Sequence, residues 1–350
     1  MIRVLVVEDS AVVRELLIRI LESDAEIKVV GTVTSGQDAL EFMQTSRPDL
    51  ITMDIHMRHM DGFETTRRIM EQWPTPIVIV SSSPEIGNQV MAFRAIDAGA
   101  LAILPSPSGI GHALHRQSAQ ELVRTVKLMS EVKVVRRRPK PNGAAAAVPT
   151  SSCRETTLAL VAIGASTGGP QALQTIVADF PADFQPAVLA VQHIASGFAD
   201  GFATWLGQSS RLPVRLAEHG ELIIPGHIYI APDQHHMTAG PGGSIRLTDE
   251  EPENGLKPAV SVLFRSVAAF YGRRAAGVLL SGMGKDGAKE LKLLRDTGAV
   301  TIAQDCESSV VHGMPGEAIR LGGATYVAPP EKIVSILTSL PVRRTSEDSE

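Results

Sequence analysis

Apolar residues in the first part of the chain form short runs that alternate with amphipathic stretches. The run at residues 2–7 (IRVLVV) is continuous and β-branched, which is typical of a parallel strand buried on both faces. Apolar residues at helical spacing follow it, and Ser10 is placed to cap that helix. The same alternation predicts strands at residues 28–32, 50–53, 77–80 and 100–104, and helices near 36–45, 63–72, 87–98 and 118–130. We therefore expect an α/β domain with a doubly wound parallel sheet.

A second alternation of the same kind begins near residue 158. It predicts strands at residues 158–163, 187–191, 275–280, 299–303 and 325–327, with helices between them. Shorter segments at 214–217, 227–231 and 244–247, with turns rich in glycine and proline, indicate a small, partly antiparallel excursion. This part is expected to be a second doubly wound parallel sheet, Rossmann-like, that carries the excursion.

The stretch between the two alternations has no regular apolar period. It reads RRRPKPNGAAAAVP, which is typical of a flexible tether. We expect a first domain at residues 1–125, a helix end and linker at 126–155, a second domain at 156–342 and an acidic tail at 343–350.

Composition and charge exclude several classes of protein. The 350 residues are 44% hydrophobic and 20% charged, and the formal net charge of -5 argues against a nucleic-acid partner. Two cysteines, Cys153 and Cys306, are too few for a disulfide framework. The N-terminal segment lacks a signal-peptide pattern, and no apolar run approaches the ~20 residues that span a bilayer. We expect a cytoplasmic protein without membrane insertion.

Acidic residues follow two of the predicted strands of the first domain. Glu8 and Asp9 come after the strand at 2–7, and Asp54 comes after the strand at 50–53. Acidic loop residues are usually only solvated. The carboxyl ends of parallel strands share one crevice, however, where these carboxylates would repel each other unless a cation lay between them. Oxygen ligands with room for water and phosphate favour Mg²⁺.

Several short motifs of the first domain occur at the ends of its predicted strands and helices. They are the Glu8–Asp9 pair, Asp54 after LITM, MDG at 60–62, Ser81 after PIVIV and AGA at 98–100. With these motifs the domain resembles the receiver domain of bacterial two-component response regulators. The resemblance implies a flavodoxin-like fold in which Asp54 accepts a phosphoryl group from a histidine kinase. It also implies that Glu8, Asp9 and Asp54 hold Mg²⁺ and that Ser81 senses the phosphoryl oxygen.

One position departs from the receiver pattern. Receivers usually carry a lysine just before the proline that follows the last strand, and this chain has Ser106 there, within ILPSP. A lysine at this position would lie near the phosphoryl group. Two unit charges about 4 Å apart interact by ~4 kcal/mol at an effective dielectric of roughly 20, so the loss of the lysine charge matters. We therefore expect Asp54 to be phosphorylated slowly or with weak coupling to the output. Arg58, where many relatives have proline, is the candidate for a replacement charge.

A glycine-rich turn follows the predicted strand at residues 158–163. It reads GASTGGP, with Ser166 in the turn and Pro170 where a helix begins. A serine between a strand and a helix can project its hydroxyl into a crevice that helix N–H groups also face. That geometry suits a nucleophile beside a stabilised oxyanion. The alternative is that Ser166 only caps the helix.

Two further polar residues follow buried strands of the second domain. His193 comes after the strand at 187–191, and Asp286 comes after the strand at 275–280, within SGMGKDG. With Ser166 at the same sheet edge, they would supply the nucleophile, the base and the orienting carboxylate of acyl transfer. The backbone around Met283 could donate N–H groups to an oxyanion. Taken singly, His193 could equally be a satisfied, partly buried histidine, and Asp286 a helix cap.

Other ligands fit these motifs less well. GASTGG lacks the spacing of a dinucleotide fingerprint, and GMGKDG has Asp286 where a phosphate-binding loop needs serine or threonine. The cluster of His227, Asp233, His235 and His236 lacks the ligand spacing of a zinc site.

Six stretches of the second domain are distinctive, namely GASTGGP, VQHI, HIYIAP, LLSGMGKDGA, AQD and GMPGEAI. With these stretches the domain resembles the catalytic domain of CheB-type chemotaxis protein-glutamate methylesterases. The resemblance implies hydrolysis of glutamate γ-methyl esters on methyl-accepting chemoreceptors, with release of methanol, and glutamine deamidation as a second activity. It assigns Ser166 as the nucleophile, His193 as general base and acid, and Asp286 as the residue that orients His193. The Met283 N–H, with Thr167 nearby, would form the oxyanion hole.

Receiver, linker and esterase together cover nearly the whole chain, which implies control of the esterase by phosphorylation. The resemblance also implies that the receiver covers the esterase crevice until the chemotaxis histidine kinase phosphorylates Asp54. No cofactor is expected for the ester hydrolysis. Two other classes stay open, a non-catalytic scaffold under phosphorylation control and a transcriptional regulator. The second domain lacks the basic helix-turn-helix signal that the regulator would need.

Overall fold

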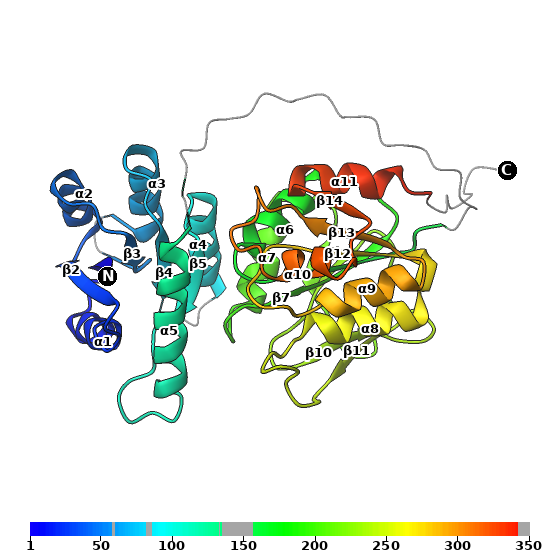
Figure 1. The fold of residues 1–350 in the computed structure, drawn as a ribbon, viewed down its shortest axis with the longest axis horizontal. Coiled ribbons are helices and arrows are strands. Elements are labelled where there is room, and N and C mark those ends of the chain that lie inside the picture. Colours follow the sequence, from blue (N-terminus) through cyan, green and yellow to red (C-terminus); the bar gives the residue numbers. More distant parts are fainter. Residues whose placement is uncertain (58–59, 82–85, 133, 135–156, 342–350) are drawn as a thin grey trace. The chain divides into compact units, whose positions relative to one another are not determined.

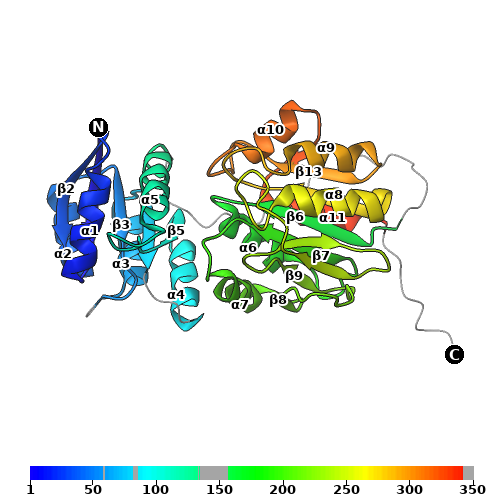
Figure 2. The same ribbon diagram turned by 90° about the horizontal axis from the view of Figure 1, so that it is seen from below.

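In the computed structural model the chain divides into two compact units, Met1–Gly143 and Ala144–Glu350. The structure describes residues 1–57, 60–81, 86–132, 134 and 157–341, so Arg58, Cys153 and the predicted linker sequence lie outside the described residues. Each unit is an α/β structure with its own sheet, and each is described by itself (Figure 1, Figure 2).

The first unit is built on a parallel sheet with the strand order β2-β1-β3-β4-β5. Every residue of β3 and β4 is buried, as their continuous apolar runs predict. The strands are β1 Ile2–Val7, β2 Ile27–Val33, β3 Leu50–Met53, β4 Ile77–Ser81 and β5 Ala102–Pro105. The helices are α1 Ala11–Leu21, α2 Gly36–Thr45, α3 Gly62–Gln72, α4 Ile86–Asp97 and α5 His115–Ser130.

Helices cover both faces of this sheet. α1 packs against α5, whereas α3 packs against both α2 and α4 (Figure 1). The predicted cap of α1 is confirmed, because the Ser10 hydroxyl accepts the Val13 N–H. The strand order reverses beside β1, so the residues that follow β1 and β3 meet at the carboxyl edge of the sheet.

The second unit is built on a parallel sheet with the order β14-β13-β12-β6-β7-β9-β8. The chain enters at β6 in the middle, builds one half of the sheet, and returns at β12 to build the other. The order therefore reverses between β6 and β12, which is where open α/β sheets bind ligands. The strands are β6 Leu160–Ala165, β7 Ala187–Gln192, β8 Val214–Leu216, β9 Ile228–Ile230, β12 Ala275–Leu279, β13 Val300–Gln304 and β14 Tyr326–Ala328.

Two layers of helices enclose the second sheet. α9 packs against α8 and α10 in one layer, and α6 packs against α7 and α11 in the other (Figure 1, Figure 2). Among the described residues, no helix is long and apolar enough to cross a membrane. The helices are α6 Gly169–Asp179, α7 Ala199–Ser209, α8 Val260–Phe270, α9 Ala288–Asp296, α10 Met314–Arg320 and α11 Pro330–Ser339, with a 3-10 turn at Gly272–Arg274.

The antiparallel excursion is smaller than its sequence pattern indicates. The segments expected at 214–217 and 227–231 are the strands β8 and β9, which extend the main sheet in parallel. Only β11 (Ile245–Thr248) is antiparallel, and it pairs with β10 (His236–Ala239), a strand that the sequence pattern did not indicate. β10 reads HMTA and has no apolar run. It is a strand because of tertiary packing, since Met237 and Ala239 join the core cluster beneath α8.

Candidate active site

Ser166 lies in the turn between β6 and α6, at the reversal of the strand order. The N-cap of α6 is Gly168, in a left-handed conformation with a φ of 76°, and no side chain caps this helix. Ser166 contributes its backbone, because its carbonyl accepts the Gly169 N–H at 2.8 Å. The cap alternative for Ser166 is therefore excluded. Its side chain is half-buried, and within the described residues its hydroxyl makes no hydrogen bond to the protein.

Two glycines allow the chain to pass close to this turn. A Cβ on Gly282 would lie 2.8 Å from the Ser166 Cβ, and a Cβ on Gly168 would lie 2.5 Å from the Val310 Cβ. Gly168 also needs to be glycine for its positive φ. The Ser166 N–H donates to the Ser281 carbonyl at 3.0 Å. The GASTGGP turn and the SGMG segment after β12 are therefore packed directly against each other.

A histidine and an aspartate from distant parts of the chain meet at this edge. His193 Nε2 lies 2.9 Å from Asp286 Oδ2, although 93 positions separate the two residues in sequence. Their side chains are 10% and 3% exposed, so the pair is shielded from bulk water. The hydrogen bond requires a proton on Nε2, which assigns the free lone pair of the neutral ring to Nδ1.

The Asp286 carboxylate is fixed by the first turn of α8. Its Oδ2 accepts the Val260 N–H at 2.7 Å, and its Oδ1 accepts the Ser261 N–H at 3.0 Å. Burial raises the pKa of this carboxyl. The hydrogen bond to His193, the charge of His193 and the hydrogen bonds from Ser261 have the opposite effect and together are stronger, so the pKa lies below its usual value. Asp286 is therefore an anion aimed at His193. It does not cap α9, whose N-cap is Gly287.

Sequence reasoning missed the N-terminus of α8 as a part of this site. Ser261 does more than donate its N–H to Asp286, because its hydroxyl donates to Glu290 at 2.8 Å and accepts the Gly287 N–H at 3.0 Å. The sequence pattern predicts helices between the strands of this domain, but nothing in that pattern places the first turn of a helix against Asp286.

Ser166 and His193 follow neighbouring strands. β6 and β7 pair in register as far as Ala165 and Gln192, and the His193 N–H donates to the Ala165 carbonyl at 2.9 Å. The structure therefore brings the His193–Asp286 pair to the strand end beside Ser166. In the described part of the chain no hydrogen bond joins the Ser166 hydroxyl to the His193 ring, and such catalytic bonds often tighten only when substrate is bound.

The residues expected in an oxyanion hole lie on the two segments that pack together at Ser166. Thr167 follows it in the turn, and the Thr167 carbonyl accepts the buried Ser281 hydroxyl at 2.7 Å. Met283 follows Gly282, and no group of the described residues accepts a hydrogen bond from its N–H. A backbone N–H without an internal partner, next to a serine, is suited to bind an oxyanion.

The carboxyl edge of the first sheet gathers the predicted acidic residues. Glu8, Asp9 and Asp54 each offer an oxygen that lies within 4.8 Å of the others. Burial, followed by the charge of Asp54, raises the pKa of Glu8 to about 7, and burial raises the pKa of Asp54. Crowded, desolvated carboxylate oxygens of this kind fit a hard divalent cation such as Mg²⁺, which displaces their protons.

Two serines lie at the ends of the neighbouring strands of the first sheet. Ser81 is the last residue of β4 and is buried, and Ser106 follows β5 and donates its N–H to the Ser81 carbonyl at 2.9 Å. The position where receivers usually have lysine therefore lies at the same sheet edge as Asp54. Arg14 is a cation near the acidic residues, and its Nη1 donates to the Glu8 carbonyl at 2.8 Å.

The histidine cluster noted in the sequence is dispersed in the structure. Within the described ranges, the acidic residues of the first sheet are the one group of ligands close enough to hold a metal ion. His236 is buried and held at both ring nitrogens, because Nδ1 accepts the Ala259 N–H and Nε2 contacts the Glu251 carbonyl, each at 3.2 Å. It has a structural role, since it links β10 to the segment that begins α8.

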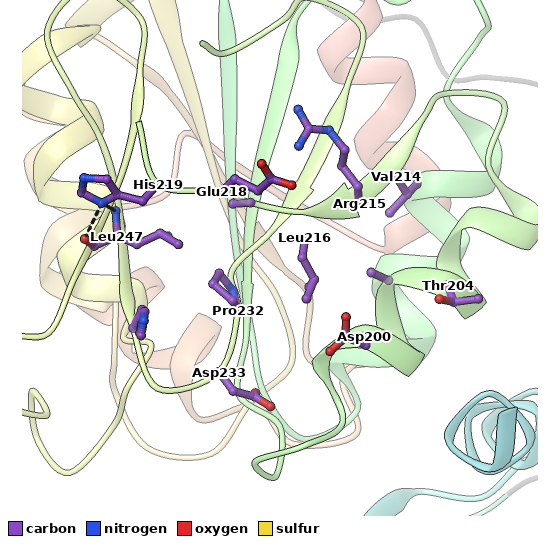
Figure 3. A pocket seen from close by; sticks show the side chains of 13 residues that line it. Asp200, Thr204, Val214, Arg215, Leu216, Glu218, His219, Pro232, Asp233 and Leu247 are labelled. Atoms are coloured by element: carbon purple, nitrogen blue, oxygen red, sulfur yellow. Dashed lines mark hydrogen bonds between the residues drawn. The ribbon is translucent and has the colours of Figure 1, made fainter. Parts of the chain in front are cut away.

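A pocket of about 650 Å³ opens at the carboxyl ends of β8 and β9 (Figure 3). Asp200 of α7 lies on one side of it, and Pro232 and Asp233, which follow β9, lie on another. Burial raises the pKa of Asp233, and its carboxylate accepts the Gly197 N–H at 2.5 Å. The loop that follows His193 is thereby tied to the wall of the pocket, which lies along the same sheet edge as the candidate site.

Both halves of the chain match known protein families. Residues 161–337 match the CheB methylesterase family, and residues 4–116 match the response regulator receiver domain family. The chain is 53% identical over 348 residues to a protein-glutamate methylesterase/protein-glutamine glutaminase of Nitrosospira multiformis, with 98% of each chain covered. It is 51% identical over 347 residues to a Geobacter metallireducens protein of the same description, numbered 4, with 98% and 100% covered. The crystal structure of the Thermotoga maritima CheB methylesterase catalytic domain is 37% identical, has a TM-score of 0.51, and covers 53% of this chain and 100% of its own.

Proposed function

Since the chain belongs to the CheB methylesterase family and carries a response-regulator receiver domain before its catalytic domain, we propose that it hydrolyses glutamate γ-methyl esters on methyl-accepting chemoreceptors. The products are methanol and a glutamate side chain. Glutamine deamidation is the second proposed activity, with ammonia leaving in place of methanol. The names of the relatives support both reactions, and the receiver supports a role in chemosensory adaptation.

In this proposal Ser166, His193 and Asp286 act as a catalytic triad. Ser166 Oγ attacks the ester carbonyl carbon while His193 Nδ1 takes the hydroxyl proton, and Asp286 stabilises the resulting imidazolium through Nε2. The imidazolium then gives its proton to the leaving oxygen, so methanol departs and an acyl-enzyme remains. Water attacks the acyl carbon, and His193 passes the water proton to Ser166 Oγ. The chemistry needs no cofactor.

Charge develops on the ester carbonyl oxygen during both attacks. The Met283 N–H is the first proposed donor to this oxygen, because it has no partner among the described residues. Thr167, next to the nucleophile, is the second. Donors of this kind are worth about 10²–10³-fold each in kcat, because they are already oriented before the charge appears.

The observation that carries the proposal is the Asp286 carboxylate, which α8 holds in place and which is bonded to His193 at the strand end beside Ser166. A buried carboxylate that orients an imidazole next to a serine supports acyl transfer. The test is to incubate the full chain with a chemoreceptor cytoplasmic fragment that carries tritiated methyl esters and to count volatile methanol. Release above the uncatalysed rate supports the proposal. No release, with or without acetyl phosphate, contradicts it.

The receiver is proposed to control this reaction. Asp54 would accept a phosphoryl group from a chemotaxis histidine kinase, with Ser81 bonding a phosphoryl oxygen. Glu8, Asp9 and Asp54 would hold Mg²⁺, which neutralises charge on the transferred group when bound. Phosphorylation would shift the population from a state in which the receiver covers the esterase crevice to one in which the crevice is open.

Asp54→Asn is expected to remove the acceleration of methanol release by acetyl phosphate. Asparagine has nearly the same shape, but its amide does not form the acyl phosphate that an aspartate forms. Methanol release is measured with and without acetyl phosphate, and Asp38→Asn, an exposed position in α2, is the control that should keep the response. An Asp54→Asn protein that still accelerates would contradict the assignment.

Ser106→Lys is expected to speed the phosphorylation of Asp54 by about tenfold or more. The new ammonium group would lie at the same sheet edge as Asp54, and a unit charge about 4 Å away contributes up to ~4 kcal/mol at an effective dielectric of roughly 20. The rate of labelling by a small radioactive phosphodonor measures this. Ser108→Lys adds the same charge further along the chain and is the control. Equal labelling of the wild type and Ser106→Lys would show that the missing lysine has no kinetic effect.

A further inference from the structure

Gln192 connects the two turns that carry Ser166 and His193. It is the last residue of β7, and only 3% of its surface is exposed. Its Nε2 group donates two hydrogen bonds, one to the Ser166 carbonyl and one to the His193 carbonyl, each at 2.8 Å. One buried amide therefore holds the backbone of the nucleophile turn and the backbone of the base turn at the same time.

The partners of this amide fix its orientation. Both groups that face Nε2 are carbonyl oxygens, so a flipped amide would place oxygen against oxygen. In the orientation that remains, Oε1 is buried and has no hydrogen-bond partner among the described residues. It packs on Gly169, where a Cβ would lie 2.3 Å away. The fold therefore tolerates an unsatisfied acceptor, and a glycine at the start of α6, in order to keep two donors in place.

A second glutamine in the same sheet shows how a fully satisfied amide is built. Gln304 is the last residue of β13 and is 1% exposed. Its Oε1 accepts the Ser281 N–H at 2.7 Å, and its Nε2 donates to the Ser308 carbonyl at 3.0 Å. Gln192 differs because its Oε1 stays unpaired, and a buried polar group without a partner in a native protein calls for a physical reason.

We propose that Gln192 is a positioning residue that sets the distance between Ser166 and His193, an inference that rests on the function proposed above. The two side chains belong to separate turns, and Gln192 Nε2 donates a hydrogen bond to a backbone carbonyl of each turn. Proton transfer from Ser166 Oγ to His193 Nδ1 requires these atoms to come within hydrogen-bond reach. A misplacement of the catalytic groups by about 1 Å costs ~10²-fold in rate. Because Gln192 positions the catalytic groups and not the substrate, its loss should lower kcat and have little effect on substrate binding.

Gln192→Met tests the proposal in the full chain. Methionine has a similar size without the donors. It removes the unpaired Oε1 and leaves the His193 carbonyl unpaired, whereas the Ser166 carbonyl keeps the Gly169 N–H. One unsatisfied group replaces another, so the thermal midpoint should stay close to that of the wild type. With the tritiated receptor fragment, kcat should fall by about 10–10²-fold while KM changes by less than about twofold.

Two further variants separate positioning from stability. Thr301 is buried in β13, where its hydroxyl accepts the Thr325 N–H at 3.0 Å. Thr301→Val should lower the thermal midpoint and leave kcat unchanged. Gly169→Ala keeps the glutamine but places a methyl group 2.3 Å from Oε1 and 2.7 Å from the Ala165 Cβ, so it should displace the amide and reproduce the loss of kcat.

A Gln192→Met protein with the kcat of the wild type overturns the proposal, as does one in which KM alone changes.

The rate at which a fluorophosphonate labels Ser166 gives a second readout, and it should fall in Gln192→Met and in Gly169→Ala. If the wild type releases no methanol, the proposed function fails, but the labelling rates still decide the role of Gln192, since equal rates refute it. If Gln192→Met does not fold, Gly169→Ala decides alone. A wild type that is not labelled at Ser166 overturns both proposals.

Discussion

Ser166→Ala is expected to abolish methanol release while the protein stays folded. The loss should reach about 10⁴-fold or more, because no acyl-enzyme forms without the hydroxyl and only binding and oxyanion stabilisation remain. Within the described residues the hydroxyl has no partner in the protein, so its removal should leave the thermal midpoint near that of the wild type. Counting released methanol, together with a circular-dichroism melting curve, measures both effects.

The control for this prediction is another serine-to-alanine change far from the strand ends. Ser335 is exposed on α11, and Ser335→Ala should keep both methanol release and labelling by a fluorophosphonate. Ser166→Ala should lose both. A folded Ser166→Ala protein that still releases methanol would remove Ser166 from the mechanism, although the described fold would stand.

Asp286→Asn is expected to lower kcat by about 10⁴-fold, since an amide can hold an imidazole in the wrong tautomer. The carboxylate accepts three hydrogen bonds, from His193 Nε2 and from the N–H groups of Val260 and Ser261. An asparagine side chain has only one oxygen, so its NH₂ group replaces either Oδ2, which faces His193 and the Val260 N–H, or Oδ1, which faces the Ser261 N–H. Both arrangements place the NH₂ group against a backbone N–H of α8. Initial rates at saturating substrate, taken below the melting transition, measure the loss.

Asp296→Asn is the matched control for this change. Asp296 is exposed near the end of α9, where it pairs with Lys292 at 2.9 Å. Its substitution should leave kcat as it is in the wild type. If Asp286→Asn retained activity within about tenfold of the wild type, His193 would not depend on the carboxylate for its orientation.

Much of the fold follows from the period of the apolar residues. The predicted strands at 2–7 and 50–53 coincide with β1 and β3, because strands that are buried on both faces are mostly apolar. Since parallel strands end on one side of a sheet, this pattern also places Glu8, Asp54 and His193 at carboxyl edges. The roles proposed for these residues come from the resemblance to known families and not from the pattern.

Other parts depend on contacts that no local pattern contains. β10 forms because it packs beneath α8, and β8 and β9 are parallel because the chain crosses back between them. The first turn of α8 meets Asp286 for the same reason, through the packing of segments that are distant in sequence. The two hydrogen bonds that the Gln192 amide donates to backbone carbonyls likewise form only when β6 and β7 lie side by side.

The site draws on both halves of the second sheet, which has a consequence for the time at which activity first arises. Ser166 and His193 follow adjacent strands, but Asp286 comes after β12, and its backbone anchors begin α8. A nascent chain that has left the ribosome only as far as β9 therefore holds a serine and an imidazole without the anion that aligns them. If the proposed triad is correct, unfinished copies should be inactive, and hydrolysis should require a chain that extends at least past Asp286.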